Sequence, residues 1–538
     1  PVVTNSTDTT GKPAAGSSFT ISASVSDNIA NTRVTLYFRN GGGTTYDSIV
    51  IADSQNNGFT HTLNLSGNGL EYYIRAFDGN SSVVSTRYSV SVKLVNLTSP
   101  NAFPAGEWRM FSVPARAVND SLLRLFKDWG SYLYDWRLYE WKGTAYTERG
   151  EDRSAKIVSG KPYWLKTVKT DKKFIVDTAY TVSTNKNFEI TLLPKEWTPI
   201  ANPFNFTVSW ASVVAATGKD SMVTGPYTYA ERSWFNPRNV LALVPWQGYY
   251  VYNHSDSVIV LKIPPIEYVG PITVAKTATV KTGNMEFAWE VSSADRIDRN
   301  NYFGISDNGK STAGYDYGLD ALRAPEGPDK GVRAVFTRAE YEKDLRRLCV
   351  DYSAMENGGA EWNVSIEAIS ADALYISNIK GLEYLPEGVS AVVVDSKRGI
   401  KVDVTNREYT FTADRNEAAR KLNVLVGTDA YITARTNGLK ELPLVSGMEN
   451  NYPNPFNPVT TISYSVAGKS RQLVTLSIYD VKGKLVKELV NKPLESGHYK
   501  ISWNGCGNNN KPAGSGVYVY RLKIGNKFQK SMMMVLVK

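Results

Sequence analysis

The sequence predicts a mainly β protein built from tandem antiparallel β-sandwich modules with a few short helices. Hydrophobic residues alternate with polar ones in many short runs, as in strands that bury one face. Gly- and Asn-rich turns separate these runs. The 538 residues, 42% hydrophobic and 21% charged, suffice for three or four globular domains.

A first module is expected over residues 1–95. Alternating runs occupy 19–25, 34–38 and 70–76, and the Gly-rich segment 40–43 forms a turn between two of them. This pattern resembles immunoglobulin-like or fibronectin-III-like modules of secreted bacterial proteins. The resemblance rests on the strand pattern, because the Cys–Trp–Cys hallmark is absent.

A second region, residues 96–270, contains an internal repeat with a period of about 89 residues. The copies are expected at about 106–168 and 195–252. Three landmarks recur in order: a Trp six residues before a Pro (Trp108, Trp197), a helical pattern ending in Gly (Gly130, Gly218) and an aromatic strand (160–165, 248–251). Three matched landmarks predict a duplication.

Nine of the twelve tryptophans lie in this region. Aromatic rings stack on sugar faces, so glycan-binding modules use them. Trp136, Trp141 and Trp234 lack an evident counterpart in the other copy and are the candidate glycan platform. Packing in the core is the alternative, and the pattern leaves both open.

A third module, again a β-sandwich, is expected over residues 275–435, and 436–447 reads as a linker. Its Gly-rich loop carries Asp307, Asp316 and Asp320, whose carboxylates are candidate calcium ligands. The loop lacks the regular D-x-D-x-D-G spacing, so a solvated loop is the alternative. No other metal or cofactor is expected.

The final module, 448–538, holds 13 Lys and Arg against 4 Asp and Glu, whereas the rest of the chain has 48 of each sign. This local charge predicts a partner surface, with edge lysines that block aggregation as the alternative. No basic helix or aromatic RNA-binding motif accompanies it, so nucleic acid is not an expected partner. No apolar run reaches the roughly 20 residues of a membrane span.

Four motifs occur in order in this module. They are NYPNPFNP (with Pro453, Asn454, Pro455, Phe456, Asn457 and Pro458), IYDVKGKLV (Tyr479, Asp480 and Gly483), GHYKISWNG (Trp503 and Gly505) and SGVYVYRLKIG (Ser515, Gly516 and Tyr518). The prolines cannot pair in a central strand and predict an extended lead-in, and DVKG predicts a hairpin turn.

Together the motifs resemble the type A C-terminal sorting domain of the type IX secretion system, whose sheet is similar to the FlgD immunoglobulin-like domain. The resemblance covers about 88 residues, with one departure at 510–514. It implies export across the outer membrane of a Gram-negative bacterium by the translocon and sorting machinery. The passenger is then released or attached to surface lipopolysaccharide.

The resemblance also extends to the basic, apolar tail. The sorting-signal residues are Lys530, Met532, Met533, Met534, Val535, Leu536, Val537 and Lys538. The segment 531–537 is β-prone and terminal, so a translocon subunit can read it by strand addition. That these residues only complete the module's own edge strand is the alternative.

Catalytic motifs are missing from the sequence. His61, His254 and His498 are its three histidines, and Gly-x-Ser-x-Gly and His-Glu-x-x-His do not occur. The two cysteines cannot form a disulfide framework or a cysteine-rich zinc site. We therefore expect no enzyme but a secreted, adhesive or glycan-binding surface protein. Because the sequence begins without a signal peptide, the alternative is the accessory region of a larger exported hydrolase whose catalytic domain lies upstream.

Overall fold

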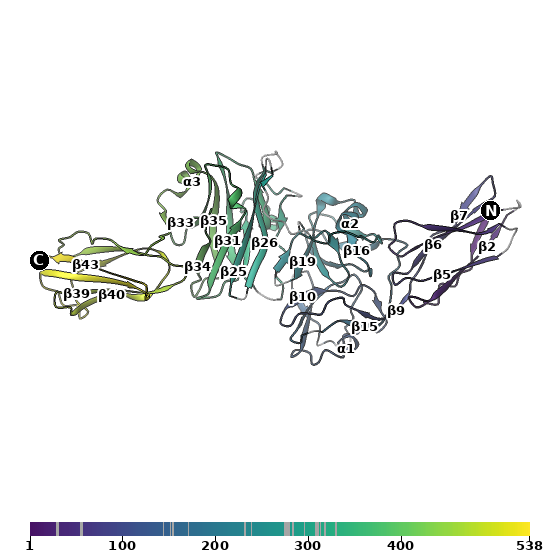
Figure 1. Ribbon diagram of the computed structural model, residues 1–538, viewed down its shortest axis with the longest axis horizontal. Coiled ribbons are helices and arrows are strands. Elements are labelled where there is room, and N and C mark those ends of the chain that lie inside the picture. The colour runs from purple at the N-terminus through teal and green to yellow at the C-terminus, as the bar shows by residue number, and fades with distance from the viewer. Residues whose placement is uncertain are drawn as a thin grey trace. The chain divides into compact units, whose positions relative to one another are not determined.

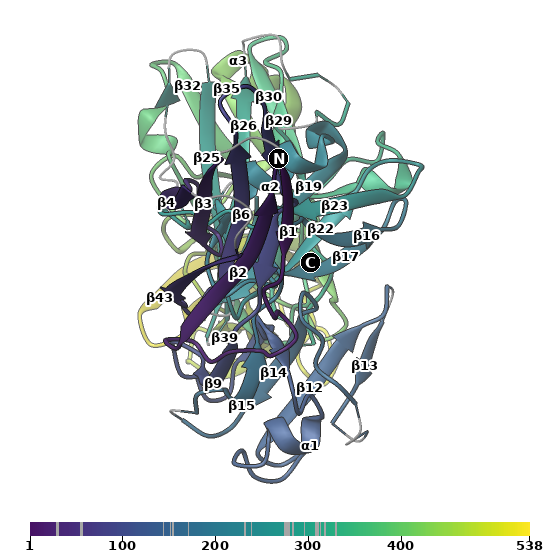
Figure 2. The same cartoon turned by 90° about the vertical axis from the view of Figure 1, so that its right-hand side faces the viewer.

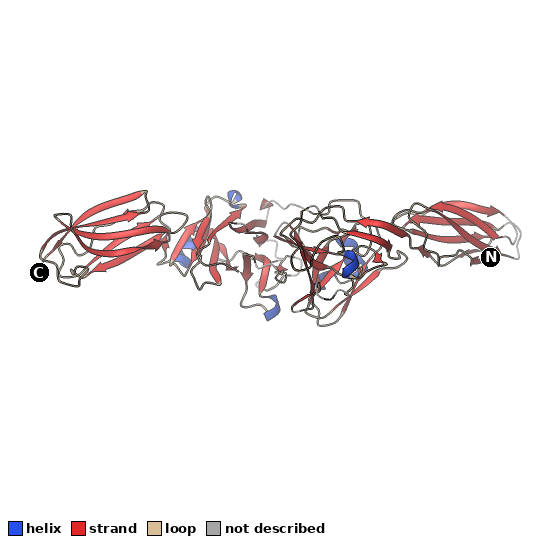
Figure 3. Ribbon diagram, turned by 90° about the horizontal axis from the view of Figure 1, so that it is seen from below, coloured by secondary structure: helices blue, strands red, loops and turns tan. Residues whose placement is uncertain are grey.

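The computed structural model consists chiefly of strands (Figure 3). It describes residues 1–27, 32–53, 58–143, 145–150, 152, 155–170, 172–230, 233–237, 239–273, 280–281, 284–294, 296–306, 311–312, 314–316, 319–328 and 331–538. Two compact units are formed, one of 1–276 with 321–330 and the other of 277–320 with 331–538. The mainly β prediction is confirmed, since the α-helices in the described ranges have four to eight residues.

The first unit opens with a sandwich of two sheets, ordered β1-β2-β5 and β4-β3-β6-β7, with β8 also paired to β6. The strands are β1 (Val2–Asn5), β2 (Ser18–Ser26), β3 (Arg33–Asn40), β4 (Asp47–Asp53), β5 (Gly58–Asn64), β6 (Leu70–Phe77), β7 (Ser82–Val84) and β8 (Tyr88–Val90). Ile21, Leu36, Tyr72 and Ile74 are fully buried. The predicted alternation therefore buries one face of each sheet.

The duplicated region follows, and copy two repeats the element order of copy one with one added strand, β21. Copy one has β9 (Lys93–Thr98), β10 (Trp108–Phe111), β11 (Arg116–Ala117), α1 (Leu122–Leu125), β12 (Trp136–Trp141), β13 (Tyr146–Glu148), β14 (Tyr163–Thr167) and β15 (Ile175–Tyr180). Copy two has β16 (Phe188–Leu192), β17 (Trp197–Ala201), β18 (Val208–Ser209), α2 (Trp210–Thr217), β19 (Val223–Ala230), β20 (Ser233–Phe235), β21 (Ala242–Leu243), β22 (Gly248–Asn253) and β23 (Ile259–Ile263). A short strand, β27 (Ala321–Leu322), and a 3₁₀ turn, Asp220–Met222, also belong to this unit.

The sheets of the two copies have matching pairings. Copy one pairs as β10-β14-β12-β13 and copy two as β17-β22-β19-β20. Figure 2 shows β12, β13 and β14 side by side. Tyr163 and Tyr249 occupy equivalent places: each hydroxyl accepts from the amide five residues earlier and donates to the carbonyl seven residues earlier. Such detailed agreement identifies a structural duplication.

The two predicted helices differ in length. α2 begins at the cap Ser209, whose hydroxyl accepts from the Ser212 amide, and ends at Gly218 with φ 68° as predicted. In copy one α1 ends at Leu125, although the pattern predicted a helix up to Gly130. Turns replace its last part while still burying Phe126 and Trp129.

The second unit begins with a large β module. Its elements are β24 (Val280–Lys281), β25 (Asn284–Ser293), β26 (Arg296–Ser306), β28 (Arg333–Thr337), β29 (Arg347–Ser353), β30 (Gly359–Glu367), β31 (Leu374–Lys380), β32 (Val389–Asp395), β33 (Ile400–Asp403), β34 (Tyr409–Thr412), β35 (Ala419–Thr428), α3 (Asp429–Thr436) and β36 (Lys440–Glu441), with 3₁₀ turns at Lys343–Leu345 and Leu382–Tyr384. Figure 1 shows β25, β31 and β35 among them. Strand pairing links these strands continuously, in the order β34-β31-β25-β26-β29-β28-β30-β35-β32-β33-β36.

A strand that changes partner explains how one continuous sheet forms two layers. The start of β29 pairs with β28, whereas its second half pairs in parallel with β26. Rings from the two halves then meet in tilted and edge-on contacts. Phe303 on β26 lies 5.7 Å from Phe336 on β28 and 4.8 Å from Trp362 on β30, between ring centroids. The module is thus a sandwich whose layers share β29.

The segment predicted as a linker, 436–447, is partly structured. β36 pairs in parallel with β33, and Gly447 already lies in β37. The linker prediction was therefore too long, because two polar residues, Lys440 and Glu441, complete a sheet edge instead of spanning open chain. The exposed part that remains includes Leu444 and Val445, which are 78% and 76% exposed.

Candidate functional site

The last module is a small sandwich with its own core. Its sheets are β37-β38-β41 and β40-β39-β42-β43. The strands are β37 (Gly447–Met448), β38 (Thr460–Val466), β39 (Gln472–Asp480), β40 (Leu485–Leu494), β41 (Gly497–Trp503), β42 (Gly516–Ile524) and β43 (Phe528–Leu536). The core is a separate hydrophobic cluster that includes Ile462, Leu476 and Leu522.

Trp503 lies at the centre of the motif residues in this core. Its ring packs against Phe456 at 5.5 Å and Tyr518 at 5.2 Å between centroids. The indole Nε1 donates to the Cys506 carbonyl at 2.9 Å. Gly505, with φ 69°, leaves room for the Pro458 carbonyl, which a Cβ would approach to 3.1 Å. Three of the four predicted motifs therefore meet around one buried ring.

The DVKG motif forms the predicted hairpin turn between β39 and β40. The Asp480 carboxylate accepts the amides of Lys482 and Lys484, both at 2.9 Å, and the Gly483 amide donates to the Asp480 carbonyl. Gly483 has φ 79°, which favours glycine. Tyr479 lies just before the turn, with the Arg521 guanidinium 5.1 Å from its ring centroid.

The sorting-signal residues form β43 at the edge of the larger sheet. β43 pairs antiparallel with β42 along its whole length, from Gly516 opposite Leu536 to Ile524 opposite Phe528. Met534 and Leu536 point into the core and are 0% and 1% exposed. The tail therefore completes the module's own sheet, the second of the two sequence-based alternatives.

The outer edge of β43 is closed over its last residues by residues 454–456, which we call the NPF segment. The Phe456 amide donates to the Val535 carbonyl and the Val537 amide to the Phe456 carbonyl, both at 3.0 Å. The Asn454 side-chain oxygen accepts the Val535 amide at 2.9 Å. Backbone groups used in this way are not open to an added strand. Strand addition over all of 531–537 is therefore excluded while this closure holds.

The outward side chains around the tail are apolar and exposed. Met533 is 70%, Val537 47% and Val517 41% exposed, and Tyr452 before the NPF segment is 82% exposed. We call the outer face made by Val517, Met533, Val535 and Val537 the tail face; Val517 lies opposite Val535 in the register.

Lys530 and Lys538 lie near the two ends of β43. The Lys530 ammonium donates to the Met448 carbonyl at 3.0 Å, which places it on the inner side of the strand with Met534, and the Lys538 amide donates to the Ser515 hydroxyl. A concentrated, exposed apolar face is a feature of binding surfaces.

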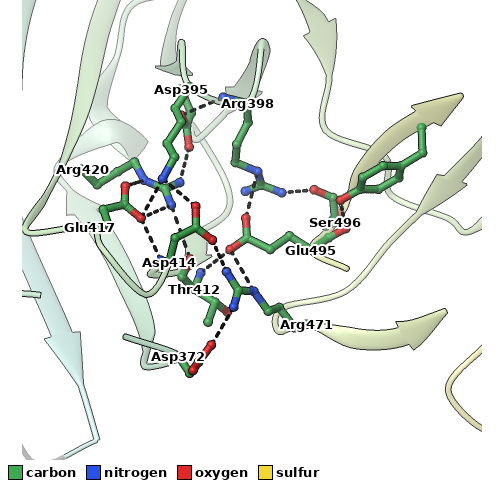
Figure 4. Close-up of polar contacts among 12 residues, drawn as sticks. Asp372, Asp395, Arg398, Thr412, Asp414, Glu417, Arg420, Arg471, Glu495 and Ser496 are labelled. Atoms are coloured by element: carbon green, nitrogen blue, oxygen red, sulfur yellow. Dashed lines mark hydrogen bonds and ion pairs between the residues drawn. The ribbon is translucent and has the colours of Figure 1, made fainter. Parts of the chain in front are cut away.

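Where the last module meets the large module of the same unit, charged side chains make the contact (Figure 4). Glu495, at the turn between β40 and β41, forms an ion pair with Arg398 at 3.1 Å and accepts the Thr412 amide at 3.0 Å. Arg398 also donates to the Ser496 carbonyl. Arg471 lies 3.8 Å from the same carboxylate.

Arg471 adds two further partners on the large module. It bonds Asp372 at 2.8 Å and also donates to Asp414. We refer to Asp372, Arg398, Asp414, Arg471 and Glu495 as the C-terminal junction. These residues come from separate loops and strand ends, so their contact depends on both modules being folded.

A buried ion pair supports the large-module side of the junction. Arg420 bonds Asp395 at 2.8 Å, with both side chains almost fully buried, and the Tyr409 hydroxyl donates to Asp395. Burial would raise the pKa of Glu417, but hydrogen bonds from Arg420, the Asp414 amide and Lys397 outweigh it and lower that pKa to about 2. A hydrogen bond from Lys397 likewise lowers the pKa of Asp414.

In the first unit the aromatic residues meet between the two copies. We define the repeat seam by six rings: Trp141, Tyr146 and Trp164 from copy one, and Tyr229, Trp234 and Tyr250 from copy two. Trp164 lies 5.3 Å from Tyr229 and 5.7 Å from Trp234 between centroids, and its Nε1 donates to the Tyr250 hydroxyl at 3.4 Å. Edge-to-face contacts of this kind stabilise buried aromatic clusters.

The predicted glycan platform is wrong. Trp136 is 7% exposed and stacks on Phe126 at 4.2 Å, and Trp234 is 6% exposed within the repeat seam. Trp141 is half-buried in the same seam. Trp136 and Trp234 therefore present no open face on which a sugar ring can stack, and Trp141 by itself does not make a platform.

The prediction failed because Trp141 and Trp234 do have counterparts in the other copy, which the sequence comparison did not recognise. Trp141 pairs across the hairpin with Tyr146, and Tyr229 pairs in the same way with Trp234, so the copies exchange Trp and Tyr. The spacing within each pair is identical, and this aromatic-x₄-aromatic pattern was the signal that sequence reasoning missed.

The described candidate calcium ligands, Asp316 and Asp320, accept hydrogen bonds from the protein itself. Asp307 lies outside the described residues. Asp320 accepts the amides of Tyr352 and Asp316, and Asp316 accepts from Thr312. Burial and the nearby Asp351 raise the pKa of Asp320 to about 8, which disfavours a cation-binding carboxylate. Within the described ranges no group of three or more His, Cys, Asp or Glu is placed to hold a metal.

Two of the three histidines, His254 and His498, have structural surroundings. His254 is buried, with Nε2 2.6 Å from the Thr224 hydroxyl, and burial lowers its pKa to about 4. His498 lies 2.9 Å from the Glu441 carbonyl. Across the part of the chain that the structure describes, no helix is long and apolar enough to cross a membrane.

One family model, the FlgD Ig-like domain, matches residues 458–527. The last module therefore contains a FlgD-type Ig-like sandwich, as the motif resemblance implied. The match leaves out both the NPF segment and the strand β43, which are bonded to each other. No curated protein matches the chain.

Solved structures share little with the chain. Dimeric latent PorU from Porphyromonas gingivalis is 10% identical with a TM-score of 0.15, covering 99% of this chain and 34% of that one. Alpha-2-macroglobulins of Escherichia coli (activated by porcine elastase) and Salmonella (mutant Y1175G) are 9% and 8% identical, with TM-scores of 0.14 and 0.15, covering 99% of this chain and 53% and 40% of theirs. The chain spans about a third to a half of these proteins, and TM-scores this low carry no argument.

Proposed function

We propose that this chain is a non-catalytic exported protein of the outer surface of a Gram-negative bacterium, and that its last module is the address read by a type IX secretion translocon. The observation that carries the proposal is the closure of β43 by the NPF segment. These two segments lie outside the FlgD-like match, and their bonds join the first of the four motifs to the tail. The upstream modules are the passenger, which is released or attached to surface lipopolysaccharide.

The tail face is the proposed recognition surface. Because Phe456 and Asn454 occupy the outer edge of β43, the translocon reads exposed side chains rather than adding a strand along the full tail. Met533 is the most exposed apolar residue of this face. The non-catalytic part of the proposal is supported by the structural roles of His254 and His498 and by the lack of nucleophile motifs.

A fusion experiment tests the proposal. Residues 448–538 are joined to an inert reporter behind a signal peptide, in a host with a working type IX system. We expect reporter on the cell surface or in the medium, and periplasmic reporter when Met533→Glu is introduced. Reporter that stays inside the cell with the unmodified module would refute the address function.

A matched control separates recognition from folding. Val481→Glu adds the same charge to an equally exposed apolar residue at the β39–β40 turn, 73% exposed, and export should be normal. Deletion of 530–538 is a poor test, because it removes the core residues Met534 and Leu536. Equal export of the Met533→Glu and Val481→Glu fusions would discard the tail face while leaving the address function intact.

A further inference from the structure

A cavity of about 360 Å³ opens beside β10, where the two copies of the duplicated region touch. Its walls are mostly apolar and include Phe103, Pro104, Pro245, Trp246 and Ile272. Arg109, on β10, is its charged wall residue. A volume of this size and a lining with few polar groups are typical of small-molecule sites.

The two copies touch through two equivalent backbone hydrogen bonds, one in each direction. The residues around the cavity can therefore be compared with the residues at the second of these contacts. The Ser112 amide donates to the Trp246 carbonyl at 3.1 Å, and the equivalent Ala201 amide donates to the Gly160 carbonyl at 3.0 Å. Trp246 and Gly160 are therefore equivalent positions. By the same alignment of Trp108 with Trp197, Arg109 corresponds to Thr198.

The backbone at this position is left-handed in both copies. Gly160 has φ 79°, a conformation that glycine adopts without cost. Trp246 has φ 70°, where a bulky side chain is strained. Strained residues persist when a particular side chain is needed at that place, and they cluster at binding sites. Copy two therefore keeps an unfavourable tryptophan where copy one has the favoured residue.

Arg109 also departs from the repeat, and its guanidinium is incompletely paired. Its Nε is buried and has no hydrogen-bond partner in the described part of the chain. Glu107 lies 3.8 Å from Nη2, at the outer limit of an ion pair. A buried donor without an acceptor is costly, and a carboxylate satisfies it with a short, strong bond.

We propose that this cavity binds a carboxylate carried on a flat aromatic group about the size of an indole. The ring lies against the apolar wall, to which Trp246 and Phe103, 8% and 9% exposed, contribute their edges, and the Arg109 guanidinium pairs with the carboxylate. The reciprocal contact, made by Thr198 of copy two and Gly160 of copy one, cannot form such a site: Thr198 has no charge, and Gly160 contributes no ring. A Cβ at Gly160 would also lie 2.5 Å from the Phe188 ring, so no larger residue fits there.

Calorimetry and ligand-observed NMR on the full chain test this inference. The probes are indole-3-acetate and a peptide ending in a free tryptophan carboxylate, each compared with its neutral amide. We expect at least one acid to bind at least tenfold more tightly than its amide. Binding of indole-3-acetate alone assigns a free small molecule, and tighter binding of the peptide assigns a chain end.

Two variants and one control locate the binding. Arg109→Gln should weaken acid binding about tenfold and leave amide binding unchanged. Arg116→Gln, which removes the same charge from an exposed position on β11, should leave both unchanged. Trp246→Gly, which installs the residue of the other copy, should weaken acid and amide alike. Because Arg109 is 32% exposed, its variant should keep the thermal midpoint of the parent.

The outcomes that overturn the inference are equally specific. Acid and amide that bind alike, or an Arg109→Gln chain that binds the acid as the parent does, would remove the carboxylate role of Arg109. No binding of any probe at millimolar concentration would remove the site.

Discussion

The repeat seam joins two copies of one fold through six aromatic rings, whereas the C-terminal junction joins two different modules through five charged side chains. The centre of the seam is shielded from water: Trp164 is 2% exposed and Tyr250 is fully buried. The junction is wetter, with Asp372 63% and Asp414 52% exposed. The two contacts therefore depend on different forces.

Those forces give the contacts different properties. Burial of large rings supplies stability that does not depend on salt or pH. The ion pairs of Arg471 with Asp372 and Asp414 have exposed carboxylates and supply little stability, whereas the Arg398–Glu495 pair is mostly buried, with the two side chains 12% and 15% exposed. We infer that the copies fold as one body, while the last module folds by itself and is then held in place. Four predictions test this comparison.

The largest effect is expected from Trp164→Ala in the repeat seam. Removal of a buried tryptophan from a packed core costs about 3–5 kcal/mol, so both copies should unfold together at lower urea. Tryptophan fluorescence of the full chain measures this, since nine of twelve tryptophans lie in the duplicated region. Tyr134→Ala, 81% exposed in copy one, is the control and should stay within about 0.5 kcal/mol. A loss below about 1 kcal/mol for Trp164→Ala would contradict a stabilising seam.

The second prediction concerns pH and Glu417. Since its folded-state pKa of about 2 lies below the ordinary value of 4.5, its stabilising contribution is complete above pH 4.5 and disappears as pH falls toward 2. Glu417→Gln should cost about 2–3 kcal/mol at pH 7, because Arg420 loses a charged partner.

Calorimetry of parent and variant between pH 2 and 7 measures the difference. The difference in unfolding free energy between the parent and Glu417→Gln should disappear as the pH falls. The difference between the parent and Trp164→Ala should stay constant, because burial raises the pKa of Tyr146 and Tyr250 and both hydroxyls stay neutral over this range. Comparison with the parent is needed because Asp320 acts in the opposite direction: its pKa of about 8 favours the folded state at low pH. If the difference in unfolding free energy between the parent and Glu417→Gln did not vary with pH, the lowered pKa of Glu417 would be contradicted.

The third prediction concerns the centre of the junction. Glu495→Gln removes the charge that pairs with Arg398 and should cost about 1–2 kcal/mol, as loss of a charge-assisted bond does. Hydrogen exchange should rise at the Thr412 amide, which donates to this carboxylate, and leave the module core protected. Glu449→Gln, an exposed change in the same module, is the control. Unchanged exchange at Thr412 would show that the junction does not persist in solution.

These contacts also mark how far the sequence could be interpreted. The sandwiches, the duplication and the DVKG turn followed from alternation, periodicity and turn chemistry, all of which are local. The repeat seam could have been predicted from the sequence. It was missed because the two copies exchange Trp and Tyr, and because the bulge between Thr224 and Tyr227 shifts the copies out of simple alignment. The junction was out of reach, because Arg471 and Asp372 are 99 residues apart and no pattern links them.

The smallest effect is expected from Arg471→Gln, and it isolates what an exposed ion pair contributes. Its partners Asp372 and Asp414 are half exposed or more, so the loss should be at most about 1 kcal/mol and should vanish in 1 M NaCl, where the Debye length is roughly 3 Å. Trp164→Ala should cost the same at both salt concentrations, since ring burial is not screened. Urea unfolding at 50 mM and 1 M NaCl measures both. If Arg471→Gln kept its full effect at high salt, the junction would be a desolvated contact like the seam, and the proposed difference between the two contacts would be wrong.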